Sequence, residues 1–282
     1  MIDLQTLVPL IVVLLMVIVG CELAREQLVA ALRRPGALLG GTLGQLLLLP
    51  ALAALVIWLW HPPQALAGGL LVVAASPGGA LSNYYCSVAR LDVAFSVALT
   101  AVSGFVALAA MPLLLAAIVP AALGVEAFEV PIGELSLRLL LFLLLPVAIG
   151  MTLRHFFPAV LERHGRAFRA AGLWLLALFL ALVFLDQRQA VLAMFWETVL
   201  LTASFTALAL LAGWWTGSAM RLSGTARAVL AVEFAVRNVG IAAVLALTTF
   251  QQAEFAAFGA LFVLLQAPLL LLALFARRAM ER

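Results

Sequence analysis

A carboxylate, a guanidinium and an amide lie close together in an otherwise apolar part of the chain. Glu233, Arg237 and Asn238 occur within residues 232–240, where every other residue is hydrophobic or glycine. An ionisable side chain at the centre of a membrane-spanning helix costs about 2.5–3.5 kcal/mol on insertion scales, so such groups by default indicate a binding or transport site. The structural alternative is that Glu233 and Arg237, four residues apart on one helical face, only neutralise each other.

Hydroxyl and amide oxygens elsewhere in the sequence provide partners for this acid. Ser82 and Asn83 follow a Pro-Gly-Gly sequence, and Ser96 and Thr100 are four residues apart, hence on one face of a helix. With Glu233 they form an all-oxygen set that has one negative charge and suits a small, hard, monovalent cation. The alternative for each single hydroxyl is a hydrogen bond to its own helix. The three histidines lie at the ends of apolar stretches, so a zinc site or a proton relay through histidine is not expected.

The elements that must position these residues are membrane-spanning helices. Of the 282 residues, 66% are hydrophobic and 10% are charged, a composition that is incompatible with a soluble domain of this length. Crossing the hydrocarbon core requires about 20 apolar residues. The expected fold is an all-α membrane protein that forms one transporter domain over residues 1–282. The nine predicted spans are 4–23, 36–60, 64–90, 92–119, 132–155, 166–186, 191–215, 225–249 and 253–277.

The basic residues indicate how these spans are oriented. All 16 are arginine, and 13 of them lie in the loops or span ends on one side of the predicted topology. The positive-inside rule therefore predicts a multi-pass protein of the inner (cytoplasmic) membrane with its N-terminus outside and its C-terminus in the cytoplasm. The arginines form no compact basic patch, so nucleic-acid binding is not expected.

Two of the predicted spans are interrupted. The third contains Pro77, Gly78 and Gly79, which remove a backbone donor and relax the helix, and the eighth contains Gly240 after the charged segment. The two spans are five apart and therefore run in opposite directions. Paired interruptions of this kind indicate a secondary transporter with inverted repeats, in which half-helix N-termini suit an anionic group and unwound carbonyls suit a cation.

Several motifs along the chain together resemble the bile acid:sodium symporter family. They are Ser76–Gly79 with Ser82 and Asn83, Asp92–Ala94 leading to Ser96–Thr100, Glu233 with Asn238 and Gly240, Arg34 and Pro35 with Gln45 and Pro50, and Gly259–Phe262. The resemblance covers nearly the whole chain. It implies a core domain, here about 36–119 and 191–277, that moves against a panel domain, here about 4–23 and 132–186.

The resemblance also implies two sodium sites. The first site corresponds to the oxygen set described above. Each residue of this set is of the type that the family has at that position. The ligands that the resemblance implies for the second site are Gln45, Glu233, the main-chain carbonyls of Phe234 and Val236, and a glutamine at position 237. This sequence has arginine at position 237. A guanidinium is always charged and only donates hydrogen bonds, so it does not ligate a cation and repels one nearby.

The presence of Arg237 leads to two hypotheses. In the first, Arg237 takes over the electrostatic role of the second cation and pairs permanently with Glu233, which leaves one sodium or none. In the second, Arg237 holds a carboxylate or sulfonate substrate through two parallel hydrogen bonds.

The remaining candidates for substrate binding are Asn238, Gln266 and the two tyrosines, Tyr84 and Tyr85. By the resemblance, Asn238 and Gln266 line the substrate cavity, and the alternative is that these amides only bond between helices. The tyrosines follow the first interruption and are placed to face a ligand, and the alternative for them is anchoring at the membrane interface.

The sequence therefore predicts an alternating-access secondary transporter of a small organic anion, coupled to sodium and without another cofactor. The alternative on the same fold is a sodium-independent or proton-coupled carrier. A membrane-embedded enzyme requires a nucleophile–base pair or a metal cluster, and no predicted span supplies histidine or a second carboxylate beside Glu233. A bile acid, a smaller carboxylate and a sulfonate all remain open as substrates, because a shared fold does not fix a ligand.

Overall fold

The computed structural model describes residues 4–23, 35–123 and 131–280, and within these ranges the regular structure is helical. Each predicted span lies on one of these helices or on consecutive helices, and the number of membrane crossings stays a prediction. In chain order the helices are α1 (Leu4–Glu22), α3 (Pro35–Trp60), α4 (Gln64–Ala75), α5 (Leu81–Val88), α6 (Val93–Leu123), α7 (Ile132–Leu139), the π-helix η1 (Leu140–Leu144), α8 (Leu145–Phe156), α9 (Pro158–Asp186), α10 (Arg188–Ala193), α11 (Phe195–Ala219), α12 (Gly224–Ala235), α13 (Val239–Thr248) and α14 (Ala253–Met280).

Six helical segments of the described chain are long and apolar enough to cross a membrane by length and composition. They are Pro35–Trp60, Val93–Ala122, Ile132–Phe156, Pro158–Asp186, Phe195–Ala219 and Ala253–Arg277. Large apolar side chains stay exposed on their outer faces, including Trp174, whose exposed fraction is 76%, and Leu211, at 65%. An apolar surface of this extent is unfavourable in water and is expected where lipid surrounds the protein.

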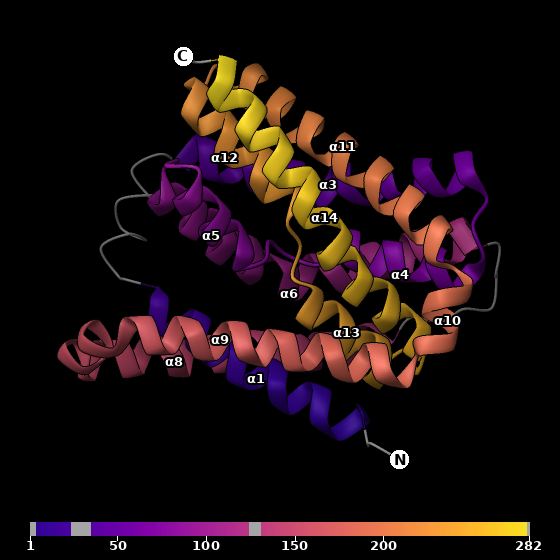
Figure 1. Cartoon of the computed structure of the whole chain (residues 1–282), viewed down its shortest axis with the longest axis horizontal. Coiled ribbons are helices and arrows are strands. Elements are labelled where there is room, and N and C mark those ends of the chain that lie inside the picture. The colour runs from indigo at the N-terminus through magenta and orange to yellow at the C-terminus, as the bar shows by residue number, and fades with distance from the viewer. Residues whose placement is uncertain (1–3, 24–34, 124–130, 281–282) are drawn as a thin grey trace.

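The helices form two groups. In Figure 1, α1, α8 and α9 lie together along one side of the molecule, and α3, α4, α5, α6, α11, α12 and α14 lie on the other side. The first group is held together by close backbone contact, because a Cβ atom added to Gly20 of α1 would clash with the carbonyl oxygen of Val147 in α8. Gly150 of α8 makes the reciprocal approach to the carbonyl oxygen of Val17. Small residues are what allow two membrane helices to pack this closely.

The two interruptions cross each other between these groups. The chain is extended at Ser76 and Val236, which directly follow α4 and α12. Gly78 and Arg237 then form an isolated antiparallel β-bridge. Pro77 explains the first interruption, because proline has no N–H and disfavours the helical conformation of the residue before it. The sequence predicts both interrupted helices, and both are present.

The second interruption differs from the prediction in its position. The sequence places it at Gly240, but Gly240 lies in the first turn of α13, and the residues outside the helices are Val236–Asn238. The physical reason is that Asn238 caps α13: its Oδ1 accepts a hydrogen bond of 3.2 Å from the amide of Ile241. The helix therefore restarts before the glycine.

Candidate functional site

Glu233 is fully buried near the crossing, where three hydroxyl groups donate to its carboxylate. Oε1 accepts from Ser82 at 2.5 Å, from Ser96, and from Thr100 at 3.2 Å. Thr100 also lies 3.1 Å from Oε2. These residues come from α5, α6 and α12, so the crossing of the interrupted helices and the packing of α6 against them bring the groups together. A buried carboxylate requires such donors, because an unpaired charge in an apolar interior is very unfavourable.

Asn83 completes the set that the sequence predicts. Its Oδ1 accepts a hydrogen bond of 2.9 Å from Ser96. The Ser82 hydroxyl lies 3.5 Å from that of Ser96 and 3.3 Å from that of Thr100. The structure therefore places all five oxygen-bearing side chains in one cluster. In the described ranges, no group of three or more His, Cys, Asp or Glu side chains could hold a metal ion. The donors of this cluster are hard oxygen atoms, which suit an alkali cation better than a transition metal.

Ser103 belongs to the same site, although the sequence pattern does not single it out. Its hydroxyl accepts a hydrogen bond of 3.1 Å from the amide of Gly78 and donates one of 3.1 Å to the carbonyl of Thr100. Ser103 is three residues after Thr100 on α6, and this helical spacing is the signal that could have found it. Gly78 itself leaves no room for a side chain, because an added Cβ atom would lie 2.9 Å from Oε2 of Glu233.

Arg237 is buried on the other side of the crossing, with an exposed fraction of 2%. Its Nη1 donates to Oε1 of Gln45 at 2.9 Å and to the main-chain carbonyl of Glu233 at 3.3 Å. Its Nη2 donates to the main-chain carbonyl of Ser76. The expected direct pairing with the Glu233 carboxylate is not found among the ion pairs of the described residues. The reason is that the helix ends at Ala235, so Arg237 no longer shares a helical face with Glu233.

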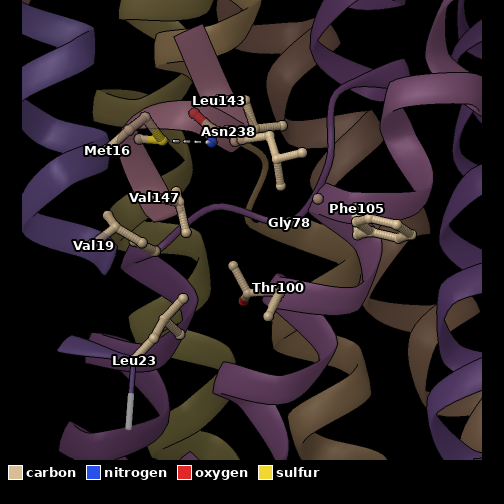
Figure 2. Close-up of a pocket in the computed structure, with 13 residues that line it drawn as sticks. Met16, Val19, Leu23, Gly78, Thr100, Phe105, Leu143, Val147 and Asn238 are labelled. Atoms are coloured by element: carbon tan, nitrogen blue, oxygen red, sulfur yellow. Dashed lines mark hydrogen bonds between the residues drawn. The ribbon is translucent and has the colours of Figure 1, made fainter. Parts of the chain in front are cut away.

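A small cavity of about 50 Å³ lies beside the oxygen cluster, between the two helix groups. Figure 2 shows Asn238 and Thr100 on its wall together with apolar side chains such as Met16 and Phe105. Nδ2 of Asn238 contacts the sulfur of Met16 at 3.6 Å. The backbone of the first interruption also reaches this cavity, at Gly78.

The other residues predicted for substrate binding do not line this cavity. Gln266 is buried and donates a hydrogen bond of 2.5 Å to the carbonyl of Ala235 at the end of α12. This amide therefore makes a hydrogen bond between two helices. Tyr84 is exposed and Tyr85 is buried, and their rings meet edge to face with 6.1 Å between the centroids. Arg237 is engaged by the protein oxygens described above. Of the five predicted residues, the structure brings only Asn238 to the cavity.

Comparison with known proteins identifies relatives of this chain. The model of the sodium bile acid symporter family matches residues 9–195. The P3 protein of Homo sapiens is 29% identical over 223 residues, which are 78% of this chain and 46% of the relative. The uncharacterized sodium-dependent transporter YocS of Bacillus subtilis is 24% identical over 234 residues, 82% of this chain and 70% of the relative.

A third relative carries a substrate in its name. The hepatic sodium/bile acid cotransporter of Rattus norvegicus is 29% identical over 164 residues, which are 56% of this chain and 45% of the relative. The chain spans less than half the length of the human and rat relatives. Their names describe those proteins.

Proposed function

The chain belongs to the sodium bile acid symporter family, and on this premise we propose that it carries a small organic anion across the membrane together with sodium, by alternating access. This agrees with the resemblance that its motifs show. Its apolar helices and its family make it a multi-pass membrane protein. The observation that carries the proposal is the oxygen cluster around Glu233.

The composition of the cluster and the spacing of its hydroxyl groups support a sodium site, and a bound ion would separate Oε1 of Glu233 from the Ser82 hydroxyl, which lies 2.5 Å away as a hydrogen-bond donor. A cation with oxygen ligands at roughly 2.4 Å, within the range known for Ca²⁺, has neighbouring ligand oxygens about 3.4 Å apart. The hydroxyl of Ser82 lies 3.5 Å and 3.3 Å from those of Ser96 and Thr100, close to this spacing. Each hydroxyl that donates to Glu233 can rotate its hydrogen away and turn a lone pair toward a cation. We therefore assign Ser82, Asn83, Ser96, Thr100 and Glu233 as the sodium ligands.

The cavity is the place where we expect the anion. Two helices begin at its wall, because Ala80 directly precedes α5 and Asn238 directly precedes α13. Helix N-termini carry a partial positive charge, which favours a carboxylate or sulfonate nearby. The apolar remainder of the wall suits a hydrophobic part of the same molecule. Thr100 lines the cavity and also contacts Glu233, so sodium and anion would bind in adjacent positions.

The size of the cavity supports a change of conformation during transport. Its volume of about 50 Å³ is far below the roughly 300–1,000 Å³ typical of pockets for drug-sized ligands. A ligand of more than a few atoms therefore requires the α1, α8 and α9 group to move relative to the crossing. We propose that the two groups act as the panel and core domains, and that the interrupted helices belong to inverted repeats. The expected location is the inner membrane, with the C-terminus in the cytoplasm.

A thermal-stability screen of the purified protein tests this function. A panel of monocarboxylates, sulfonates and bile acids is measured with sodium and with an equal concentration of potassium. We expect one class of anion to raise the melting temperature only when sodium is present, because ligands stabilise the state that binds them. The same anion should then enter proteoliposomes down an imposed sodium gradient.

Two results would contradict the proposal. A Glu233→Gln variant that retains sodium-dependent stabilisation would show that the cluster is not the ion site. Uptake that follows a pH gradient and ignores sodium would instead support the proton-coupled carrier, in which Glu233 binds the proton.

A further inference from the structure

The guanidinium of Arg237 is enclosed by oxygen atoms from three separate segments. Gln45 comes from α3, Ser76 from the first interruption, and the carbonyl of Glu233 from the last turn of α12. The two amino groups of the guanidinium make all of these contacts. The side chain is 2% exposed, so these protein oxygens replace water around the two amino groups, whereas Nε is buried without a hydrogen-bond partner.

These oxygens would lack a donor if residue 237 were neutral and short. The carbonyl of Ser76 lies where α4 has ended, and the chain there is extended, so no helical amide follows in register to bond it. The amide of Gln45 turns its oxygen toward Arg237, and its Nε2 has no hydrogen-bond partner. Three acceptor oxygens thus converge on one buried point, and oxygen atoms are the ligands that hard cations prefer.

The surroundings of Arg237 also argue against a direct contact with substrate. Its amino groups already donate to protein oxygens, and the residue is not part of the cavity wall. An anion in the cavity meets Asn238 and Thr100 instead. The guanidinium is therefore positioned as a structural charge at the crossing.

We propose that Arg237 is a built-in cation that permanently fills a second ion site, so that this transporter binds one exchangeable sodium ion where its Arg237→Gln variant binds two. The inference rests on the proposed sodium site at Glu233. The second site of the variant would consist of Gln45, the glutamine side chain introduced at position 237, and the main-chain carbonyls of Ser76 and Glu233. The charges of the Glu233 and Arg237 side chains cancel within the protein. One sodium ion bound at the first site therefore adds one net positive charge.

Equilibrium binding of radioactive sodium to the purified full-length protein tests this inference. We expect one sodium per chain for the wild type and two for Arg237→Gln. Arg237→Lys retains the positive charge and should keep one sodium. Arg227→Gln is the matched control, because Arg227 also donates to a main-chain carbonyl, that of Leu222, but lies away from the crossing. Its sodium count should equal that of the wild type.

The outcomes separate this inference from the proposed function. If the wild type binds one sodium and Arg237→Gln also binds one, the built-in cation is refuted and the Glu233 site stands. Two sodium ions on the wild type would likewise refute the built-in cation and leave the Glu233 site intact. If the wild type binds none and Arg237→Gln binds one, the built-in cation stands and sodium coupling through Glu233 fails. If neither binds sodium, both fail.

A second measurement covers the case in which Arg237→Gln folds and melts but is too unstable for an equilibrium sodium count. Sodium must then raise the melting temperature of Arg237→Gln more than that of Arg237→Lys, because only the glutamine variant gains an ion site. An equal effect on both variants refutes the inference.

Discussion

Gly78 and Arg237 face each other in an isolated antiparallel β-bridge at the point where the two interrupted helices cross. Hydrogen bonds flank the bridge on both sides, from the amide of Gly79 to Val236 at 3.1 Å and from the amide of Asn238 to Pro77 at 2.9 Å. Backbone groups that leave a helix inside a membrane must find partners in the protein or in a cavity. Here each interruption supplies partners for the other, and this pairing fixes the site residues on both sides of it.

The close approach at the bridge predicts that Gly79→Ala is destabilising. An added Cβ atom would lie 2.5 Å from the carbonyl oxygen of Arg237 and 2.8 Å from its carbon. These are main-chain atoms of a buried segment and have little freedom to move, so we expect at least the roughly 1–3 kcal/mol typical of overpacking. The melting temperature of the purified variant measures the effect. Gly36→Ala is the control, since a Cβ atom there has no neighbour within 4 Å. Equal melting temperatures for the two variants would contradict the importance of this contact.

The oxygen cluster around Glu233 is the part of the candidate site that can be predicted from the sequence. Glu233, Ser82 and Thr100 are expected to meet because few polar groups occur in these spans, and each of them needs a partner in an apolar interior. Helical spacing places Ser96 on the same face as Thr100. The grouping of these residues is predictable because the scarcity of polar side chains leaves few ways to pair them.

The surroundings of Arg237 are not predictable in the same way. Its pairing with Glu233 is expected from a spacing of four residues, which assumes a continuous helix. The helix ends between them, and the three acceptors of Arg237 are set by how α3 and the first interruption pack against it. Contacts of this kind depend on tertiary structure and have no periodic signal in the sequence. The start of α13 at Val239 likewise depends on the capping by Asn238.

Removing one hydroxyl of the cluster should weaken sodium binding. Ser96→Ala takes away a ligand oxygen and the single hydroxyl donor that lies within hydrogen-bond distance of both Glu233 and Asn83. Hydrogen bonds to charged groups contribute about 1.5–3 kcal/mol, so we expect sodium affinity to fall by roughly tenfold or more. Sodium-dependent shifts of the melting temperature measure it. The control Ser87→Ala changes an exposed serine of α5. Unchanged affinity in Ser96→Ala would remove Ser96 from the site.

A negative charge at the cavity wall should exclude an anionic ligand. Asn238→Asp retains an oxygen that caps α13, because aspartate caps helices about as well as asparagine does. Its carboxylate would repel a bound carboxylate or sulfonate, and we expect affinity for the stabilising anion to fall by roughly tenfold or more. Asn238→Ser also caps the helix but stays neutral, so it should lose only a few-fold. Isothermal titration in the presence of sodium compares the two variants. Wild-type affinity in Asn238→Asp would place the anion elsewhere.

Gly104 offers a way to fill the cavity without disturbing the fold. It lies in α6 on the cavity wall, and an added Cβ atom meets nothing within 4 Å. Alanine is more favourable than glycine within a helix by about 0.5–1 kcal/mol, so Gly104→Ala should be slightly more stable and should bind the anion more weakly. Gly165→Ala in α9 has the same free space, and we expect it to leave binding unchanged. Isothermal titration with the stabilising anion compares the two. Tighter or equal binding by Gly104→Ala would contradict the position assigned to the anion.

The charge of Arg237 predicts how transport responds to the membrane potential. With one sodium ion per monovalent anion the cycle moves no net charge, because Glu233 and Arg237 stay with the protein. Arg237→Gln would move two sodium ions with each anion, and one net charge is worth about 2.3 kcal/mol per 100 mV, or roughly 50-fold in the accumulation ratio. Proteoliposomes that hold a potassium gradient and valinomycin set the potential while labelled anion uptake is followed. We expect wild-type accumulation to be independent of the potential and Arg237→Gln accumulation to increase when the interior is negative. A wild type that already responds with one charge per anion would rule out the single-sodium cycle.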